Sequence, residues 1–133
     1  MEALIASGIL LVAVVAVTGA ISAGQQNAYE AHVRIAGVFA AEELMGRLVA
    51  VDYDDLPGWN GFAEAPGEMT DMNDAPFPEN FDMVGRDVEI STSLKKLDDL
   101  NVNIRGRDVI VTAVDADGSA LVTLNRFIPE PQS

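Results

Sequence analysis

The feature that most constrains this chain is a long uncharged segment near its start. No charged residue stands between Glu2 and Glu30, and residues 3–23 read ALIASGILLVAVVAVTGAISA. At about 1.5 Å per residue, a helix of this length spans roughly 30 Å, the thickness of a bilayer's hydrocarbon core. A buried core helix seldom stays apolar on every face for so long. We therefore expect residues 1–24 to form a membrane-anchor helix.

The basic residues that usually accompany such segments are missing. A cleaved secretory signal begins with a positively charged stretch, and basic flanks set the orientation of an ordinary anchor. This chain has no Lys or Arg before Arg34. The segment is therefore an unusual example of either class.

The rest of the chain is strongly acidic. Residues 51–133 hold 17 Asp and Glu against 6 Lys and Arg, and the whole chain carries a net charge of −13. This charge argues against binding to nucleic acid or to an anionic lipid surface, both of which require basic residues. The absence of cysteine excludes a disulfide framework, a thiolate zinc site, an iron–sulfur cluster and covalent haem attachment.

Helix-forming residues continue beyond the apolar segment, and no proline occurs in residues 25–51. Mostly apolar positions recur there at three- and four-residue spacing; they are Ile35, Val38, Glu42, Met45 and Val49, with Leu48 beside them. We expect one helix of about fifty residues whose second half is amphipathic and continues into a head domain. Gly19 and Gly24 each weaken it by about 1 kcal/mol relative to Ala, so they are the candidate positions for helix melting.

Glu2 is the most informative single residue of the apolar segment. A lone carboxylate at the edge of a membrane span is costly unless it has a partner, although the first turn of a helix favours negative charge. Small residues that follow Glu2 in the apolar segment would let neighbouring helices approach closely. The candidate packing residues are Ala6, Gly8, Ala13, Ala16, Gly19 and Ala20.

These residues resemble a known family. The opening Glu-Ala-Leu-Ile-Ala-Ser-Gly-Ile-Leu at positions 2–10, followed by an Ala/Val-rich run, is similar to the N-terminal helix of type IV pilins and pseudopilins. The segment 41–45, Ala-Glu-Glu-Leu-Met, is similar to the Ala-Glu segment near the end of that helix. The resemblance covers the first fifty residues, and the remainder is similar only in general architecture.

The resemblance implies a mode of assembly in which the helix of residues 1–24 is first a membrane anchor and later part of the filament core. In that family a leader is cleaved, the new first residue is N-methylated, and a nearby glutamate pairs with the N-terminal amine of a neighbouring subunit. Glu2 and Met1 are therefore the expected assembly residues. The family glutamate is usually the fifth mature residue. Here either three residues are missing ahead of Met1, or the start is misassigned, or the lineage is processed differently.

The C-terminal part predicts a loop followed by strands. Residues 52–86 are rich in proline and glycine, so we expect an acidic region without regular structure. Its aromatic residues should pin it onto a sheet; they are Tyr53, Trp59, Phe62, Phe77 and Phe81. Period-two alternation predicts strands near 87–91, 100–105, 109–114 and 120–128, with a turn at 115–118.

These expectations define the fold class. Residues 87–133 should form an antiparallel meander of three or four strands, with one face against the amphipathic half of the helix. The chain is thus predicted to be an α+β protein with one long N-terminal helix and a small antiparallel sheet, as in pilins.

Candidate chemistry is sparse. The single histidine, His32, lies in the predicted helix, and we find no nucleophile pattern or phosphate-binding loop, so an enzyme is not expected. Calcium is the one candidate ligand, because two acidic clusters supply the oxygen donors that it prefers. They comprise Asp52, Asp54 and Asp55, then Asp71, Asn73 and Asp74. A solvated acidic surface explains the same residues.

The sequence thus favours a structural subunit of a type IV pilus-like extracellular filament. It would be a helical homo-oligomer whose subunits sit in the inner (cytoplasmic) membrane before the pilus assembly machinery incorporates them. A minor pilin or pseudopilin of a secretion or uptake system is the first alternative. A monomeric single-pass membrane protein with an acidic ligand-binding head is the second.

Overall fold

The computed structural model describes residues 2–132 and divides into two compact units, residues 1–32 and 33–133. Met1, one of the two expected assembly residues, lies outside the described residues.

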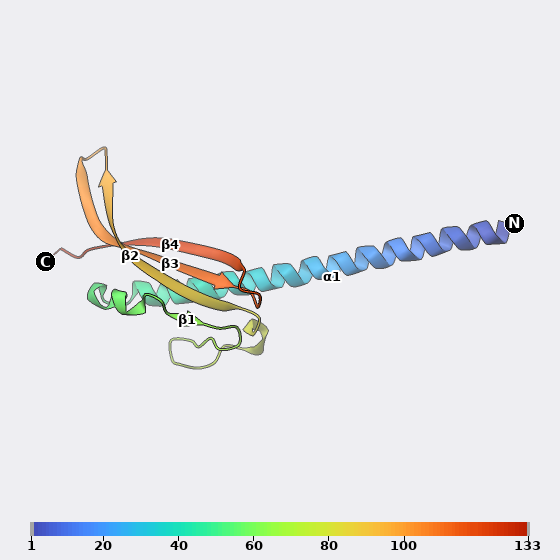
Figure 1. Ribbon diagram of the computed structural model, residues 1–133, viewed down its shortest axis with the longest axis horizontal. Helices are drawn as coiled ribbons and strands as arrows, with labels where there is room; N and C mark the ends of the chain where they lie inside the picture. The colour runs from blue at the N-terminus through green and yellow to red at the C-terminus, as the bar shows by residue number, and fades with distance from the viewer. Residues whose placement is uncertain (1, 133) are drawn as a thin grey trace. The chain divides into compact units, whose positions relative to one another are not determined.

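The predicted long helix is confirmed. Helix α1 spans Glu2–Val49 and contributes residues to both units (Figure 1). It is helical at Gly19 and at Gly24, so neither glycine interrupts it in the isolated chain. Whether the helix melts there on assembly stays a prediction.

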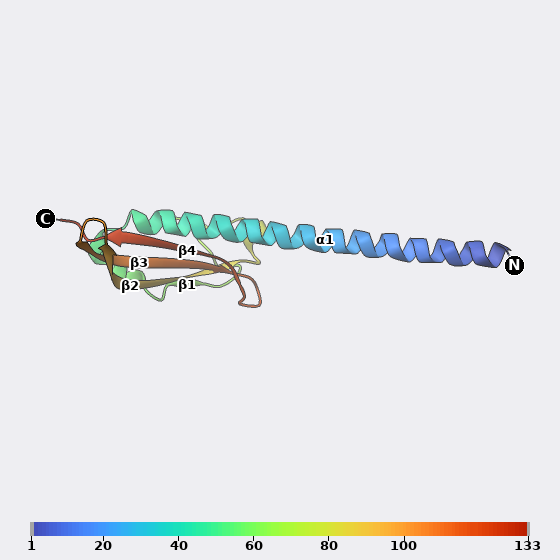
Figure 2. The ribbon, with the colours of Figure 1, turned by 90° about the horizontal axis from the view of Figure 1, so that it is seen from above.

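The second unit contains a four-stranded antiparallel sheet, which confirms the α+β fold. Its strands are β1 (Ala63–Glu64), β2 (Gly85–Leu97), β3 (Val102–Val114) and β4 (Ala120–Pro129), in the order β1-β2-β3-β4 (Figure 2). Neighbours in sequence are neighbours in the sheet, as expected for a meander.

The turn predicted at 115–118 joins β3 to β4. The Asp115 carboxylate accepts hydrogen bonds from the backbone N–H groups of Asp117 and Ser119, each at 2.9 Å. Gly118 has a φ of +83°, a conformation that costs glycine little.

Two of the expected strands are in fact one. Residues 100–105 and 109–114 were predicted as separate strands, but β3 runs unbroken from Val102 to Val114, and residues 98–101 form the turn after β2. The β2–β3 pairing extends to Leu97 opposite Val102, whereas β4 pairs with β3 only as far as Gly106. Residues 94–105 therefore form a two-stranded hairpin end, here called the ribbon.

The region 52–86 is more ordered than predicted. It contains two 3-10 helices, η1 (Tyr53–Trp59) and η2 (Glu79–Phe81), and the short strand β1. Its five aromatic residues pack against the core, as expected. Short 3-10 turns and a two-residue strand leave little periodicity in a sequence, which is why the alternation test missed them.

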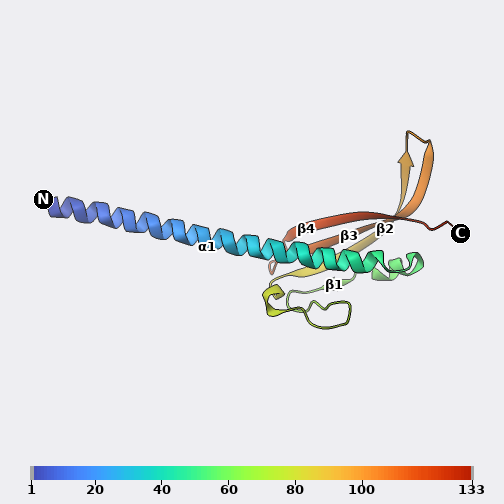
Figure 3. The same ribbon diagram turned by 180° about the vertical axis from the view of Figure 1, so that it is seen from behind.

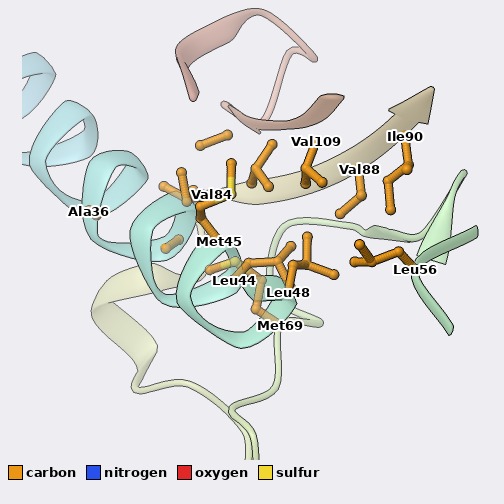
Figure 4. Packing of buried hydrophobic residues seen from close by; sticks show 14 of the residues in the cluster. Ala36, Leu44, Met45, Leu48, Leu56, Met69, Val84, Val88, Ile90 and Val109 are labelled. Carbon is orange, nitrogen blue, oxygen red and sulfur yellow. The ribbon is translucent and has the colours of Figure 1, made fainter. Parts of the chain in front are cut away.

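The core lies between the C-terminal part of α1 and the inner face of the sheet (Figure 3). Figure 4 shows Leu44, Met45 and Leu48 of α1 facing Val84, Val88 and Val109 of the sheet side. The helix residues buried in this core are Val33, Ala36, Gly37, Ala40, Ala41, Leu44, Met45 and Leu48.

The buried helix face differs from the predicted one. Of the predicted stripe only Met45 and Leu48 are buried, while Ile35 is 67% exposed and Val49 is exposed. Half of the buried helix residues are Ala or Gly, and these small residues let the helix approach the sheet closely. A Cβ placed on Gly37 would lie 3.0 Å from Leu121 Cδ1 of β4.

Candidate functional site

The N-terminal unit presents its apolar side chains to its surroundings on every face. All described residues up to His32 are exposed. The large hydrophobic residues among them are 55–76% exposed; they are Leu4, Ile5, Ile9, Leu10, Leu11, Val12, Val14, Val15, Val17 and Ile21. The helix is long and apolar enough to cross a membrane. An apolar surface of this extent needs lipid or protein to cover it.

Two hydroxyl groups in the apolar segment form hydrogen bonds within the helix. Ser7 donates to the carbonyl of Ala3 and Thr18 donates to the carbonyl of Val14, both at 2.8 Å. Intrahelical bonds of this kind let a hydroxyl enter an apolar medium without losing its hydrogen bond. These two residues therefore do not oppose burial of the segment.

Helix geometry sorts the predicted packing residues onto two faces. Glu2 lies in the first turn of α1. Steps of three, four or seven residues keep side chains on one face of a helix. Such steps connect Glu2 with the alanines at 6, 13, 16 and 20 and with Ile9; we call this set the Glu2 face.

The two predicted packing glycines lie outside the Glu2 face of the helix. Gly8 and Gly19 are eleven residues apart, about three turns, so they share a face with each other and lie to one side of the Glu2 face. A Cβ added at Gly8, Gly19 or Gly24 would meet nothing within 4 Å.

The most elaborate polar arrangement lies in the second unit and is centred on Arg86. This side chain, on β2, is only 1% exposed. Its Nε donates to Glu64 Oε1 at 2.6 Å, and its Nη1 donates to Glu43 Oε2 at 2.5 Å. The guanidinium thus joins carboxylates from α1 and β1.

Backbone carbonyls and an aromatic ring complete the surroundings of Arg86. Nη1 also donates to the carbonyl of Ala40 at 2.9 Å, and Nη2 donates to that of Thr70 at 2.7 Å. The guanidinium carbon lies 5.0 Å from the centre of the Phe77 ring. A buried charge is tolerated when it is paired and hydrogen-bonded in this way.

Arg47 extends the network. Its Nη2 donates to Glu43 Oε1 at 2.8 Å and to the carbonyl of Thr70 at 2.9 Å. The Glu64 carboxylate also accepts from the backbone N–H of Thr70 at 2.8 Å. We infer a structural role, because both guanidinium groups and both carboxylates are bonded to partners within the protein, although Arg47 Nε is buried without one among residues 2–132.

Sequence reasoning missed Arg86, although a signal was present. Arg86, Val88 and Ile90 alternate in one phase, and the last two are core residues. A charged residue in the core-facing phase of a strand indicates a buried ion pair. This signal was overlooked because the charged residues of this part of the chain were interpreted only as an acidic surface.

An apolar groove lies beside the network. It has a volume of about 600 Å³. Its apolar lining is formed by Phe39, Met72, Pro76, Phe77, Pro78 and Phe81, and its polar lining includes Glu42, Glu43, Arg47 and Asp71. The rings of Phe39 and Phe77 lie 5.6 and 5.3 Å from that of Phe81. Figure 1 shows the loop that precedes β2 on the β1 side of the sheet.

The two acidic clusters lie at different places. Asp52, Asp54 and Asp55 line a surface depression of about 590 Å³ together with Glu130, whereas Asp71 lines the apolar groove. Among residues 2–132, no three His, Cys, Asp or Glu side chains gather closely enough to hold a metal ion.

The carboxylate of the second cluster organises its own turn. Asp71 Oδ1 accepts from the backbone N–H groups of Asn73 and Ala75, at 2.7 and 3.0 Å. Asp74 follows with a φ of +61°. Calcium binding at either cluster stays a prediction from ligand type alone.

No family model, curated protein or solved structure matches this chain.

Proposed function

We propose that this chain is a structural subunit of a type IV pilus-like extracellular filament, assembled through its N-terminal helix. The observation that carries the proposal is the exposure of every described residue up to His32, on a segment whose one charge, Glu2, precedes an uncharged run. A surface of this kind must be covered by lipid or by other copies of the helix.

The Glu2 face supports packing by other copies. Without a hydrophobic driving force between helices in a membrane, association depends on close packing of small side chains. Four alanines, with Ile9 among them, supply a mostly small surface on the Glu2 face. Lipid alone would cover large apolar side chains equally well and would not require this run of alanines.

The Glu2 carboxylate adds a requirement for a partner. A buried charge is compensated when an opposite charge lies against it, and no basic residue stands before Arg34. The N-terminal amine of a neighbouring copy is the opposite charge that the family resemblance supplies. Pairing of this kind would set the axial register between subunits.

The proposal places the chain in two locations in turn. The apolar helix would hold the subunit in the inner (cytoplasmic) membrane, and the pilus assembly machinery would then move it into the filament. The acidic head would face the surrounding water, where its net negative charge keeps the polymer soluble.

Substitution of Glu2 tests the proposal. In cells that produce this chain, Glu2→Ala should remove it from the sheared fibre fraction while membrane levels stay unchanged. Ala6→Val, on the same face, should weaken assembly, because a bulkier side chain separates the helices. Leu11→Val lies on the opposite side of the helix and serves as the matched control. Normal amounts of fibre from Glu2→Ala would contradict the pairing.

The abundance of the chain in fibres distinguishes the closest alternative. A major subunit makes up most of the fibre mass, whereas a minor pilin or pseudopilin is present in traces. Quantifying this chain against total fibre protein therefore assigns its role.

A further inference from the structure

In the second unit, the face of helix α1 that points away from the sheet is mostly apolar. Steps of four and three residues place Ile35, Phe39, Glu42, Gly46 and Val49 on this face; we call this set the outer stripe. Ile35 is 67% exposed, Phe39 is 58% exposed and Val49 is 41% exposed. A surface helix normally carries polar residues opposite its buried face, whereas Glu42 is the one charged residue of the outer stripe. This face therefore has the composition of a contact surface.

Two grooves flank the outer stripe. One is the apolar groove described above, of about 600 Å³, and the other has a volume of about 330 Å³. The second groove is lined by residues of α1 and β4, among them Met45 and Leu124. Glu42 and Gly46 line both grooves, so they form the ridge between them. Helices pack by fitting the ridges of one into the grooves of another, and this surface has the shape that such packing requires.

Gly46 is not required by the packing of the second unit itself. A Cβ added there would meet nothing within 4 Å, and glycine inside a helix lowers its stability relative to alanine. Small residues at a helix–helix contact let the two backbones approach closely. Gly46 therefore marks the position where an incoming helix would cross α1.

Charge indicates which helix can lie on this surface. Glu43 and Arg47, at the rim of the apolar groove, are already paired with each other at 2.8 Å. The second unit holds 19 acidic against 8 basic residues, so the second units of two copies repel each other. Residues 3–29 carry no charge. This part of a second copy can approach the acidic second unit without like-charge repulsion.

From the shape, the apolar character and the charge we infer that the outer stripe binds the apolar N-terminal segment, residues 3–23, of a second copy. That segment is exposed and apolar on every side, so a contact through its Glu2 face leaves other sides free. The contact joins different parts of two chains, so it is heterologous and can repeat along a fibre. The inference rests on the proposed function and adds the surface of the second unit that the N-terminal helix contacts.

Photo-cross-linking of the full chain tests the contact. p-Benzoylphenylalanine in place of Ile35 puts a photoreactive side chain on the outer stripe. Illumination of sheared fibres should give a covalent dimer in which peptide mass spectrometry joins position 35 to residues 3–23 of the second copy. The same photoreactive residue in place of Ser119, in the exposed β3–β4 turn, should give no such link.

Gly46→Leu separates assembly from folding. The second unit should stay folded, because the added side chain has open space around its Cβ. The amount of the chain in fibres should nevertheless fall severalfold, because leucine holds the two helices apart. Ala116→Leu adds similar bulk in the exposed β3–β4 turn and should leave the amount of fibre unchanged. Urea titration of both variants verifies that they fold.

The outcomes distinguish this contact from the filament itself. Fibres that contain the chain but link position 35 only to the second unit of another copy, only to lipid, or to nothing would overturn the inference and leave the proposed function standing. A normal amount of fibre from Gly46→Leu would also overturn it. Absence of the unmodified chain from every fibre would overturn both.

Discussion

The Arg86 side chain links strand β2 to three other parts of the second unit. It bonds to α1 through Ala40 and Glu43, to β1 through Glu64 and to the following loop through Thr70. Because a buried pair that loses one partner leaves an uncompensated charge, Arg86→Met should lower the free energy of unfolding by about 3–5 kcal/mol. Urea titration of the detergent-solubilised chain, followed by fluorescence of its one tryptophan, Trp59, measures this change.

A surface arginine provides the control. Arg126→Met, at an exposed position of β4, should change the stability by no more than about 0.5 kcal/mol. Adding Glu64→Leu to Arg86→Met should restore part of the loss, because Glu43 keeps Arg47 as its partner and no carboxylate of the network is then left without a cation. A loss below about 1 kcal/mol for Arg86→Met would show that the network is not what holds these elements together.

At the scale of the element, helix α1 contains two glycines that should respond in opposite ways. A side chain at Gly37 would meet Leu121, whereas one at Gly46 would meet nothing within 4 Å. Gly37→Leu should therefore cost about 1–3 kcal/mol through overpacking. Gly46→Leu should raise stability by up to about 1 kcal/mol, since leucine is the better helix former.

The same urea titration compares the two glycine variants. Equal effects of the two changes would mean that α1 does not contact β4 closely at Gly37. A loss confined to Gly37→Leu would support the close approach of helix and sheet.

The sequence predicted the elements better than their contacts. The uncharged run and the absence of proline were sufficient to predict α1, and period-two alternation located β2 and β4. The buried face of the helix was predicted only in part, because four of its eight residues are Ala or Gly, which a pattern of large apolar residues does not include. Arg86 was missed because its partners are 22 and 43 residues away in sequence, and local patterns carry no such information. Helix geometry places the predicted packing glycines, Gly8 and Gly19, on a different face of the helix from the predicted packing alanines.

For the whole molecule, the N-terminal helix should determine where the chain resides. Val12→Asp with Val15→Asp should release the protein from membranes on alkaline extraction, since each charge costs about 2.5–3.5 kcal/mol in a bilayer centre. The matched control is Ile35→Asp with Val49→Asp, which places the same charges on exposed apolar positions of the second unit. Equal extraction of both variants would contradict a membrane anchor in residues 1–24.

The central claim, that this chain is a filament subunit, is tested most directly by mass spectrometry of fibres sheared from the cells that produce it. The account predicts that the chain is present in the sheared fraction and that its N-terminal peptide carries a methyl group on the first residue, as the pilin resemblance implies. A chain found only in the membrane fraction, with an unmethylated N-terminus, would contradict the account and favour a single-pass membrane protein with an acidic head.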